Sequence, residues 1–169
     1  IAKGEKMDFI VQKATELGVA SIIPFIASRT VPKFKKDEAS KKIERWQKIA
    51  IEAAKQCRRS IVPKIESIKD FSEMLQGLSL KALSREWEGY LKIILWEDAE
   101  SMHLKDRLRE LSNIQGIIII VGSEGGLSKE EVQEAERHGF ITSRLFNNIL
   151  RTETAAIAIL SIINYEIGD

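Results

Sequence analysis

A glycine-rich stretch at residues 122–126 (Gly-Ser-Glu-Gly-Gly) lies between an apolar run, 117–121, and the pair Ser128 and Glu131. The run is typical of a buried parallel strand, and the Ser-x-x-Glu spacing predicts a capping box that starts a helix. Such a loop directs backbone N–H groups toward one point and lets a ligand approach closely. The pattern therefore indicates a ligand site, with a tight turn that binds nothing as the alternative. Neither G-x-G-x-x-G nor a Walker lysine is present.

A second group of polar residues begins the apolar C-terminal segment, where residues 148–155 read Asn-Ile-Leu-Arg-Thr-Glu-Thr-Ala. A purely structural role explains two of these residues: Thr152 would cap the helix, and Glu153 would interact favourably with the positive end of the helix dipole. A cation is mildly unfavourable at a helix N-terminus, so Arg151 should have a partner or a function. We predict an ion pair between Arg151 and Glu153.

Residues 52–59 (Glu-Ala-Ala-Lys-Gln-Cys-Arg-Arg) form a third group, with Arg29 upstream. Arg58 and Arg59 near a helix C-terminus would stabilise the dipole, which is the structural alternative to a functional role. Lys33, Lys35 and Lys36 surround Phe34. This basic patch suits phosphate contact or a solvated loop.

The composition fits one globular domain. The chain has 169 residues, 44% hydrophobic and 30% charged, and a net charge of +1 from 26 basic and 25 acidic side chains. RNA affinity would therefore have to come from local patches. Cys57 is the only cysteine, which excludes an intrachain disulfide and fits a reducing cytoplasm. No apolar run is long enough to span a bilayer, and His103 and His138 show no metal-ligand spacing.

Helical and strand patterns alternate along the chain. Apolar periodicity predicts helices over 7–17, 43–57, 71–75, 104–111, 128–139 and 151–167. Strands are expected at 19–27, bent at Pro24, and at 64–68, 92–96, 117–121 and 140–145. We expect a loop at 31–37, and 77–89 stays unassigned. The order predicts an α/β fold with a mainly parallel sheet.

Four blocks of the sequence, in order, resemble the RsmE family of SPOUT ribosomal RNA methyltransferases over nearly the whole chain. They are residues 13–29, 45–63, 121–128 and 149–155. Two positions depart from the family pattern. Ser123 stands where proline is usual, which predicts a more mobile loop, and Phe146 stands where glycine is frequent, which predicts a narrower pocket.

The resemblance implies an α/β domain with parallel strands, flanking helices and a deep C-terminal trefoil knot. It also implies a homodimer, with S-adenosylmethionine bound in the knot, an RNA site that spans both subunits and no metal. We expect residues 1–169 to form this methyltransferase domain. The family's N-terminal PUA-like barrel is expected to be absent from this chain.

The resemblance further implies methylation of N3 of a uridine in small-subunit (16S) ribosomal RNA. Arg29 and Arg59 would stabilise the uracil anion, Gln56 would orient an arginine or the base, and Glu52 or Glu153 would accept the proton. With Arg151, these form the predicted catalytic set. The predicted cofactor residues are Trp96, Glu97, Gly122, Glu124, Gly125, Gly126, Leu145, Asn148, Ile149 and Leu150. The predicted RNA contacts are Lys33, Lys35, Lys36 and Arg58.

Two other functions are compatible with the residues. A non-catalytic RNA-binding or ribosome-assembly factor with the same fold would bind RNA without the cofactor. A nucleotide- or phosphate-binding α/β protein would use the glycine loop as an anion site.

Overall fold

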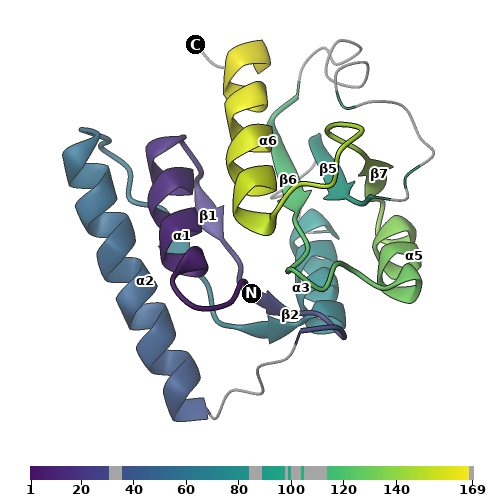
Figure 1. Cartoon of the computed structure of the whole chain (residues 1–169), viewed down its shortest axis with the longest axis horizontal. Coiled ribbons are helices and arrows are strands. Elements are labelled where there is room, and N and C mark those ends of the chain that lie inside the picture. The colour runs from purple at the N-terminus through teal and green to yellow at the C-terminus, as the bar shows by residue number, and fades with distance from the viewer. Residues whose placement is uncertain (31–35, 84–88, 98, 100–103, 105–113, 168–169) are drawn as a thin grey trace.

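The computed structural model describes residues 1–30, 36–83, 89–97, 99, 104 and 114–167 (Figure 1). Its helices are α1 (Lys6–Glu16), α2 (Lys36–Gln56), α3 (Phe71–Leu83), α5 (Lys129–Arg137) and α6 (Thr152–Ile167). Its strands are β1 (Ser21–Ile22), β2 (Phe25–Ile26), β3 (Lys64–Ile65), β4 (Lys69–Asp70), β5 (Tyr90–Leu95), β6 (Gly116–Ile120) and β7 (Ile141–Ser143).

All strand pairs among the described residues are parallel, as expected for the α/β class. The strands form three small sheets, ordered β1-β3, β2-β4 and β6-β5-β7, where we had expected one sheet. Pro24 separates β1 from β2, because proline has no N–H to donate to a ladder. Its carbonyl instead accepts a hydrogen bond from the Lys69 N–H at 3.2 Å.

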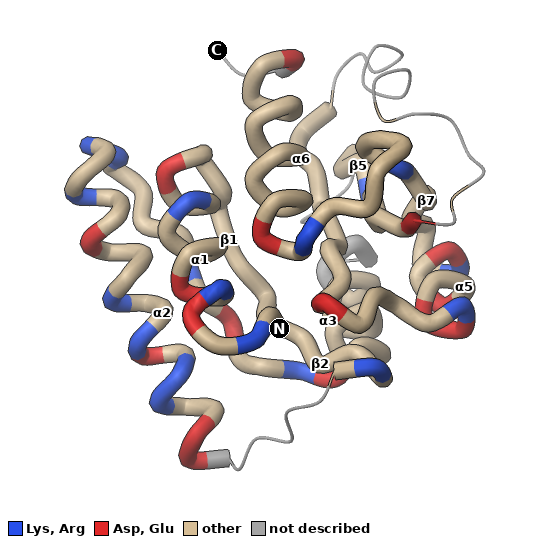
Figure 2. Tube along the Cα trace, in the orientation of Figure 1, with Lys and Arg blue, Asp and Glu red and all other residues tan. Residues whose placement is uncertain are grey.

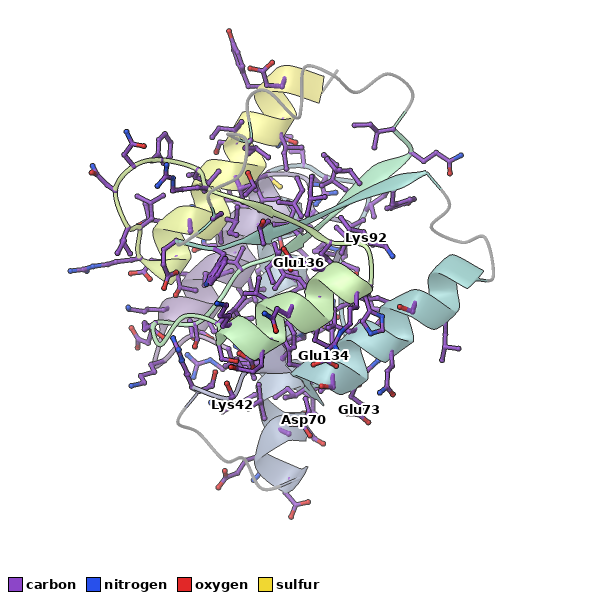
Figure 3. The ribbon with its side chains drawn as sticks, turned by 90° about the vertical axis from the view of Figure 1, so that its right-hand side faces the viewer. Lys42, Asp70, Glu73, Lys92, Glu134 and Glu136 are labelled. Carbon is purple, nitrogen blue, oxygen red and sulfur yellow. The ribbon has the colours of Figure 1, made fainter. Side chains whose placement is uncertain are left out.

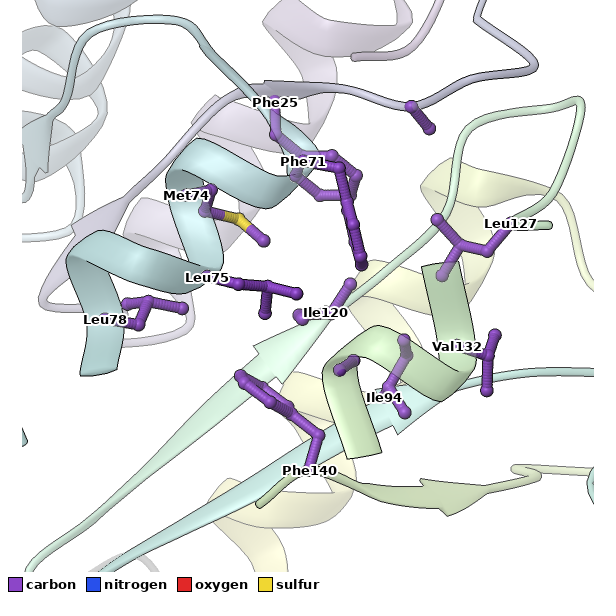
Figure 4. Packing of buried hydrophobic residues seen from close by; sticks show 12 residues of the cluster. Phe25, Phe71, Met74, Leu75, Leu78, Ile94, Ile120, Leu127, Val132 and Phe140 are labelled. Atoms are coloured by element: carbon purple, nitrogen blue, oxygen red, sulfur yellow. The ribbon is translucent and has the colours of Figure 1, made fainter. Parts of the chain in front are cut away.

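Helices cover both faces of the β6-β5-β7 sheet. Side chains alternate across a strand, so neighbours on β5 enter different cores. Ile93 packs with Ile159 and Ile163 of α6. Ile94 faces the other side, where α3 and α5 supply Leu75, Leu78, Val132 and Ala135 to a cluster closed by Phe25 and Phe71 (Figure 4). The result is a helix–sheet–helix sandwich, with Ile93, Ile94 and Ile120 as its buried apolar strand residues.

Helices α1 and α2 pack together beside this sandwich, and α1 lies between α2 and α6 in Figure 1. Met7 and Val11 of α1 meet Trp46 and Ala50 of α2 in a third apolar cluster. The Trp46 indole N–H donates to Asp8 Oδ1 at 3.1 Å. Basic and acidic residues are interspersed along α2 (Figure 2).

Several helices end in the same local structure. After α1, Gly18 has φ +93° while the N–H of Val19 donates to Ala14 O at 3.1 Å. Gly139 plays the same part after α5, with φ +83°. These left-handed positions suit glycine and complete Schellman motifs. After α2 the position is occupied by Arg58, at φ +59°, which costs a residue with a Cβ roughly 1–2 kcal/mol.

The bounds of two helices differ from those expected, and a third expected helix lies almost wholly outside the described residues. Helix α2 begins at Lys36, so Lys36 and Asp37 are helical where a loop was predicted. Acidic residues suit a first helical turn, and Asp37 and Glu38 lie there. Helix α3 continues to Leu83 because Met74, Leu75 and Leu78 keep one buried face. Of the helix expected at 104–111, only Leu104 is among the described residues.

The face formed by α3 and α5 is closed by polar contacts. Ser72 Oγ donates to Glu134 Oε2 at 2.9 Å, and Glu134 lies between the two helices in Figure 3. Ser79 Oγ lies 2.5 Å from His138 Nδ1. Lys92 Nζ donates to the His138 carbonyl at 3.0 Å. No helix in the described part of the chain is long and apolar enough to cross a membrane.

Candidate functional site

A cleft opens at the carboxyl ends of β5, β6 and β7. In open α/β sheets this edge is where ligands bind. The cleft at this edge is therefore the candidate ligand site. Four segments line it: residues 95–97, residues 121–123 with 126 and 127, residues 143–150, and Thr152 with Ala155 at the start of α6.

The strand register positions the floor of this cleft. Leu95 and Ser143 are partners at the ends of β5 and β7. Just beyond them, the Trp96 N–H donates to the Ser143 carbonyl at 3.1 Å. The segment 96–97 and the segment 144–150 therefore leave the sheet side by side, which explains why residues distant in sequence share one cleft.

The glycine loop forms the opposite wall. The Gly126 N–H donates to the Ser123 carbonyl at 2.9 Å, and Gly126 has φ +69°. Ser123 is buried, and its Oγ lies 3.2 Å from Thr30 Oγ1. This hydroxyl pair ties the loop to the segment after β2 at the position where the family usually has proline.

Gly125 faces away from the cleft, toward Arg29. A Cβ built on Gly125 would lie 2.9 Å from the Arg29 carbonyl oxygen and 3.1 Å from its Cβ. The two backbones thus touch at a distance that only glycine allows. Arg29 itself is exposed, so the structure places this predicted catalytic residue beside the glycine loop but outside the cleft lining.

Glu131 joins the capping box to the same neighbouring segment. Ser128 is the N-cap of α5, and its N–H donates to Glu131 Oε2 at 2.8 Å, while the Glu131 N–H donates to Ser128 Oγ at 3.2 Å. The second carboxylate oxygen accepts from the Ser28 N–H at 2.7 Å. The capping box predicted from the sequence is confirmed, and it also anchors residues 27–30.

Lys6 connects the glycine loop to α6. Its Nζ lies 3.1 Å from Glu124 Oε1 and 3.4 Å from Glu153 Oε2. Burial acts to raise the pKa of Glu124, but hydrogen bonds from its own N–H, from Lys6 and from the Lys3 N–H hold that pKa below its usual value. Glu124, a predicted cofactor residue, and Glu153, a predicted proton acceptor, are thus both structural partners of Lys6.

The predicted Arg151–Glu153 ion pair is wrong. Arg151 is exposed, and no described carboxylate lies within ion-pair distance of it. Its carbonyl accepts from the Ala155 N–H at 2.8 Å, so Arg151 occupies the cap position that we had expected for Thr152. The helix then directs Glu153 toward Lys6 instead.

The remaining predicted catalytic residues cluster at the other end of α1. The Arg59 guanidinium donates to the carbonyls of Thr15, Gly18 and Val19 at 2.8–3.1 Å. Gln56 and Glu52 are exposed near it on α2, and Glu52 pairs with Lys55 at 2.8 Å. Since α1 rises about 1.5 Å per residue, this group lies on the order of 15 Å from the Lys6 end. Within one chain it does not meet the cleft.

The predicted RNA contacts are only partly described. Arg58 is exposed directly after α2. Lys33 and Lys35 lie outside the described residues, and of Lys36 the structure describes only its place as the first residue of α2.

Most of the predicted cofactor residues line the cleft: Trp96, Glu97, Gly122, Gly126, Leu145, Asn148, Ile149 and Leu150. Glu124 and Gly125 do not, because one pairs with Lys6 and the other packs on Arg29. Phe146 lines the cleft as expected, with 46% of its surface exposed.

Sequence reasoning missed Ser143 and Arg144, which also line the cleft. Their position at the carboxyl end of a predicted parallel strand was the available signal.

Comparisons with known proteins identify the family of this chain. The sequence pattern of the RNA methyltransferase domain family matches residues 1–164. The ribosomal RNA small subunit methyltransferase E of Bacillus subtilis is 36% identical over 171 residues, which cover 98% of this chain and 63% of that protein. The chain therefore spans somewhat less than two thirds of that relative.

Solved structures resemble the fold over nearly the whole chain. One is a putative methyltransferase from Legionella pneumophila, in complex with the bound cofactor SAM. Its TM-score is 0.82 at 36% identity, and the match covers 98% of this chain and 63% of that chain. The second is ribosomal RNA small subunit methyltransferase E from Neisseria gonorrhoeae, bound to S-adenosyl methionine. Its TM-score is 0.81 at 33% identity, and the match covers 98% of this chain and 62% of that chain. Together with the family match, these likenesses establish that this chain belongs to the RNA methyltransferase domain family, and within it to the RsmE family that its motifs resemble.

Proposed function

We propose that this chain is the S-adenosylmethionine-dependent catalytic domain of a methyltransferase that modifies N3 of a uridine in 16S ribosomal RNA. The observation that carries the proposal is the cleft. Two of the four motif blocks, 121–128 and 149–155, converge on it at the carboxyl edge of the sheet. Its relatives are named as methyltransferases of small-subunit ribosomal RNA, and two similar structures contain bound S-adenosylmethionine.

The residues of the cleft fit such a cofactor. Val121, Leu127, Leu145 and Leu150 provide apolar walls for an adenine ring. Gly122 and Gly126 have no side chains that would fill the cleft they line. A Cβ on Gly126 would lie 3.1 Å from Glu97 Oε1. Two polar atoms at the floor, Ser143 Oγ and Arg144 Nε, are buried without a partner among the described residues. When bound, S-adenosylmethionine supplies an electrophilic methyl group on a sulfonium centre.

The protein's own contribution is to position the base and favour its reactive form. Uridine N3 carries a weakly acidic proton and becomes nucleophilic when that proton leaves. An arginine near the uracil carbonyl oxygens stabilises the resulting anion. We assign this role to Arg29, which is exposed and whose backbone contacts the glycine loop. The Lys6 bridge holds Glu124 and Glu153 in place, so the loop and the start of α6 keep a fixed spacing.

Arg59, Gln56 and Glu52 reach a cleft only if a second copy of the chain contributes them. The proposed function therefore includes a homodimer whose RNA site combines the cleft of one subunit with the α2 end of the other. It also includes the trefoil knot, which residues 143–150 would form as they pass the glycine loop.

Titration of S-adenosylmethionine into the purified chain by calorimetry tests the cofactor site. We expect saturable binding of one ligand per chain, competed by S-adenosylhomocysteine but not by ATP. Competition by ATP would instead support a nucleotide-binding protein. Absence of binding by folded protein would contradict the catalytic proposal and favour the RNA-binding alternative.

A matched pair of variants locates the binding. Ala155 lines the cleft, whereas its neighbour Thr154 is exposed on the same helix. Ala155→Phe should abolish binding and Thr154→Phe should preserve it, with thermal unfolding as a check that both fold. Mass spectrometry of small-subunit RNA incubated with the chain and S-adenosylmethionine then identifies the methylated base, which should be 3-methyluridine.

A further inference from the structure

Two neighbouring polar groups in the cleft lack hydrogen-bond partners among the described residues. Ser143 is fully buried at the end of β7, and its Oγ makes no hydrogen bond within the described part of the chain. The Nε of Arg144 is likewise buried and unpaired. Buried polar atoms are normally hydrogen-bonded, because losing water without a replacement partner costs free energy. Both residues line the cleft, so a ligand there is the natural partner.

The charge of the cleft points to the chemistry of that ligand. Among the described residues that line it, Arg144 is the only cation and Glu97 the only acid. They leave adjacent strand ends, since Leu95 pairs with Ser143 and the Trp96 N–H donates to the Ser143 carbonyl. No ion pair joins Arg144 to Glu97 or to any other described carboxylate. The guanidinium is therefore available to an anionic group.

We propose that Arg144 and Ser143 recognise the carboxylate at the amino-acid end of the cofactor, an inference that rests on the proposed function. A guanidinium presents planar paired N–H donors that match the two oxygens of a carboxylate. The Ser143 hydroxyl adds a donor from the strand end directly before it. The pair makes the cleft specific for adenosine ligands that keep the amino-acid end.

The test compares two ligands that share the thioadenosine and differ in the amino-acid end. S-adenosylhomocysteine carries the carboxylate, whereas 5′-methylthioadenosine does not. For the wild-type chain, calorimetry should give tighter binding of S-adenosylhomocysteine. Arg144→Ala should weaken that ligand by about 10- to 100-fold, the range for hydrogen bonds to a charged group. Binding of 5′-methylthioadenosine should change by less than about two-fold, since it has no carboxylate to lose.

Control variants separate recognition from folding. Arg144→Lys should keep part of the preference because the charge remains. Arg137→Ala, at the exposed end of α5, removes the same charge away from the cleft and should leave both affinities unchanged. Because the Arg144 side chain has no partner in the described chain, Arg144→Ala should not lower the unfolding temperature.

The possible failures are distinguishable. If Arg144→Ala weakens both ligands equally, or neither, or if Arg137→Ala has the same effect, the recognition role is refuted while the proposed function stands. Equal affinity of the wild type for both ligands refutes it as well. If the folded wild type binds neither ligand, the proposed function and this inference fall together.

Discussion

Replacing Gly125 with alanine should destabilise the protein, although the new side chain is a single methyl group. The φ of Gly125 lies outside the left-handed region, so alanine can adopt its conformation without backbone strain. The added Cβ would, however, lie 2.9 Å from the carbonyl oxygen of Arg29. Real Cβ contacts are not that short, and the obstacle is backbone, which cannot turn aside as a flexible side chain would.

The magnitude follows from two opposing terms. Inserting a methyl group into a close contact costs about 1–3 kcal/mol through the shifts it forces. Alanine also has less conformational freedom than glycine in the unfolded chain, which stabilises the folded state by about 0.4–1 kcal/mol. Subtracting the lower values from each other and the upper values from each other gives a net loss of about 0.6–2 kcal/mol of unfolding free energy. For a chain of this length that lowers the unfolding temperature by about 1–8 °C.

Gly77→Ala provides a control with the opposite sign. Gly77 lies within α3, and its added Cβ would approach only the flexible end of Lys69, at 3.4 Å from Nζ. Alanine is favoured over glycine in a helix by about 0.5–1 kcal/mol. The unfolding temperature of this variant should therefore rise by about 1–4 °C.

Differential scanning calorimetry of the wild type and the two variants measures these unfolding temperatures. Gly125→Ala should unfold below the wild type and Gly77→Ala above it. Displacing the glycine loop should also weaken S-adenosylhomocysteine binding, because Gly122, Ser123 and Gly126 line the cleft. If Gly125→Ala unfolds at or above the wild-type temperature, the contact between the glycine loop and Arg29 does not constrain the fold, and the reasoning is refuted.

Two further predictions concern the end of α2. Arg59→Ala removes three hydrogen bonds to carbonyls at the end of α1, and should lower the unfolding free energy in urea by about 1–3 kcal/mol, with Arg59→Lys intermediate. Unchanged stability would show that water replaces the guanidinium without cost. Arg58→Gly should raise the unfolding free energy by about 1 kcal/mol, because Arg58 has φ +59° at a position that favours glycine. A loss of stability in the same urea experiment would mean that the Arg58 side chain makes a stabilising contact that outweighs the strain.

Local patterns in the sequence were sufficient to predict most elements and their ends. The Ser128–Glu131 capping box, the glycines after α1 and α5 and the apolar strand at 117–121 all depend on neighbours within a few residues. Hydrogen bonding and periodicity over such short spans are readable without a fold. The glycine loop and the segment 145–150 could be assigned to one site through the family resemblance.

The tertiary structure decided how the polar residues are paired. Lys3 meets Glu124 across 121 positions, Ser28 meets Glu131 across 103, and Thr30 meets Ser123 across 93. No short-range pattern encodes such contacts, because they arise only when parallel strands and crossing helices bring distant segments together. For this reason Glu153 pairs with Lys6 rather than with the nearby Arg151, and Arg59 clamps the end of α1.

The same principle applies to the floor of the cleft. The sequence alone indicates that a glycine loop follows an apolar strand and that a polar turn precedes the last helix. Only the β5–β7 register, with Leu95 opposite Ser143, placed Ser143 and Arg144 beside Trp96 and Glu97. Register depends on how whole strands pack in a sheet, so the identity of the groups facing the ligand is a property of the folded chain.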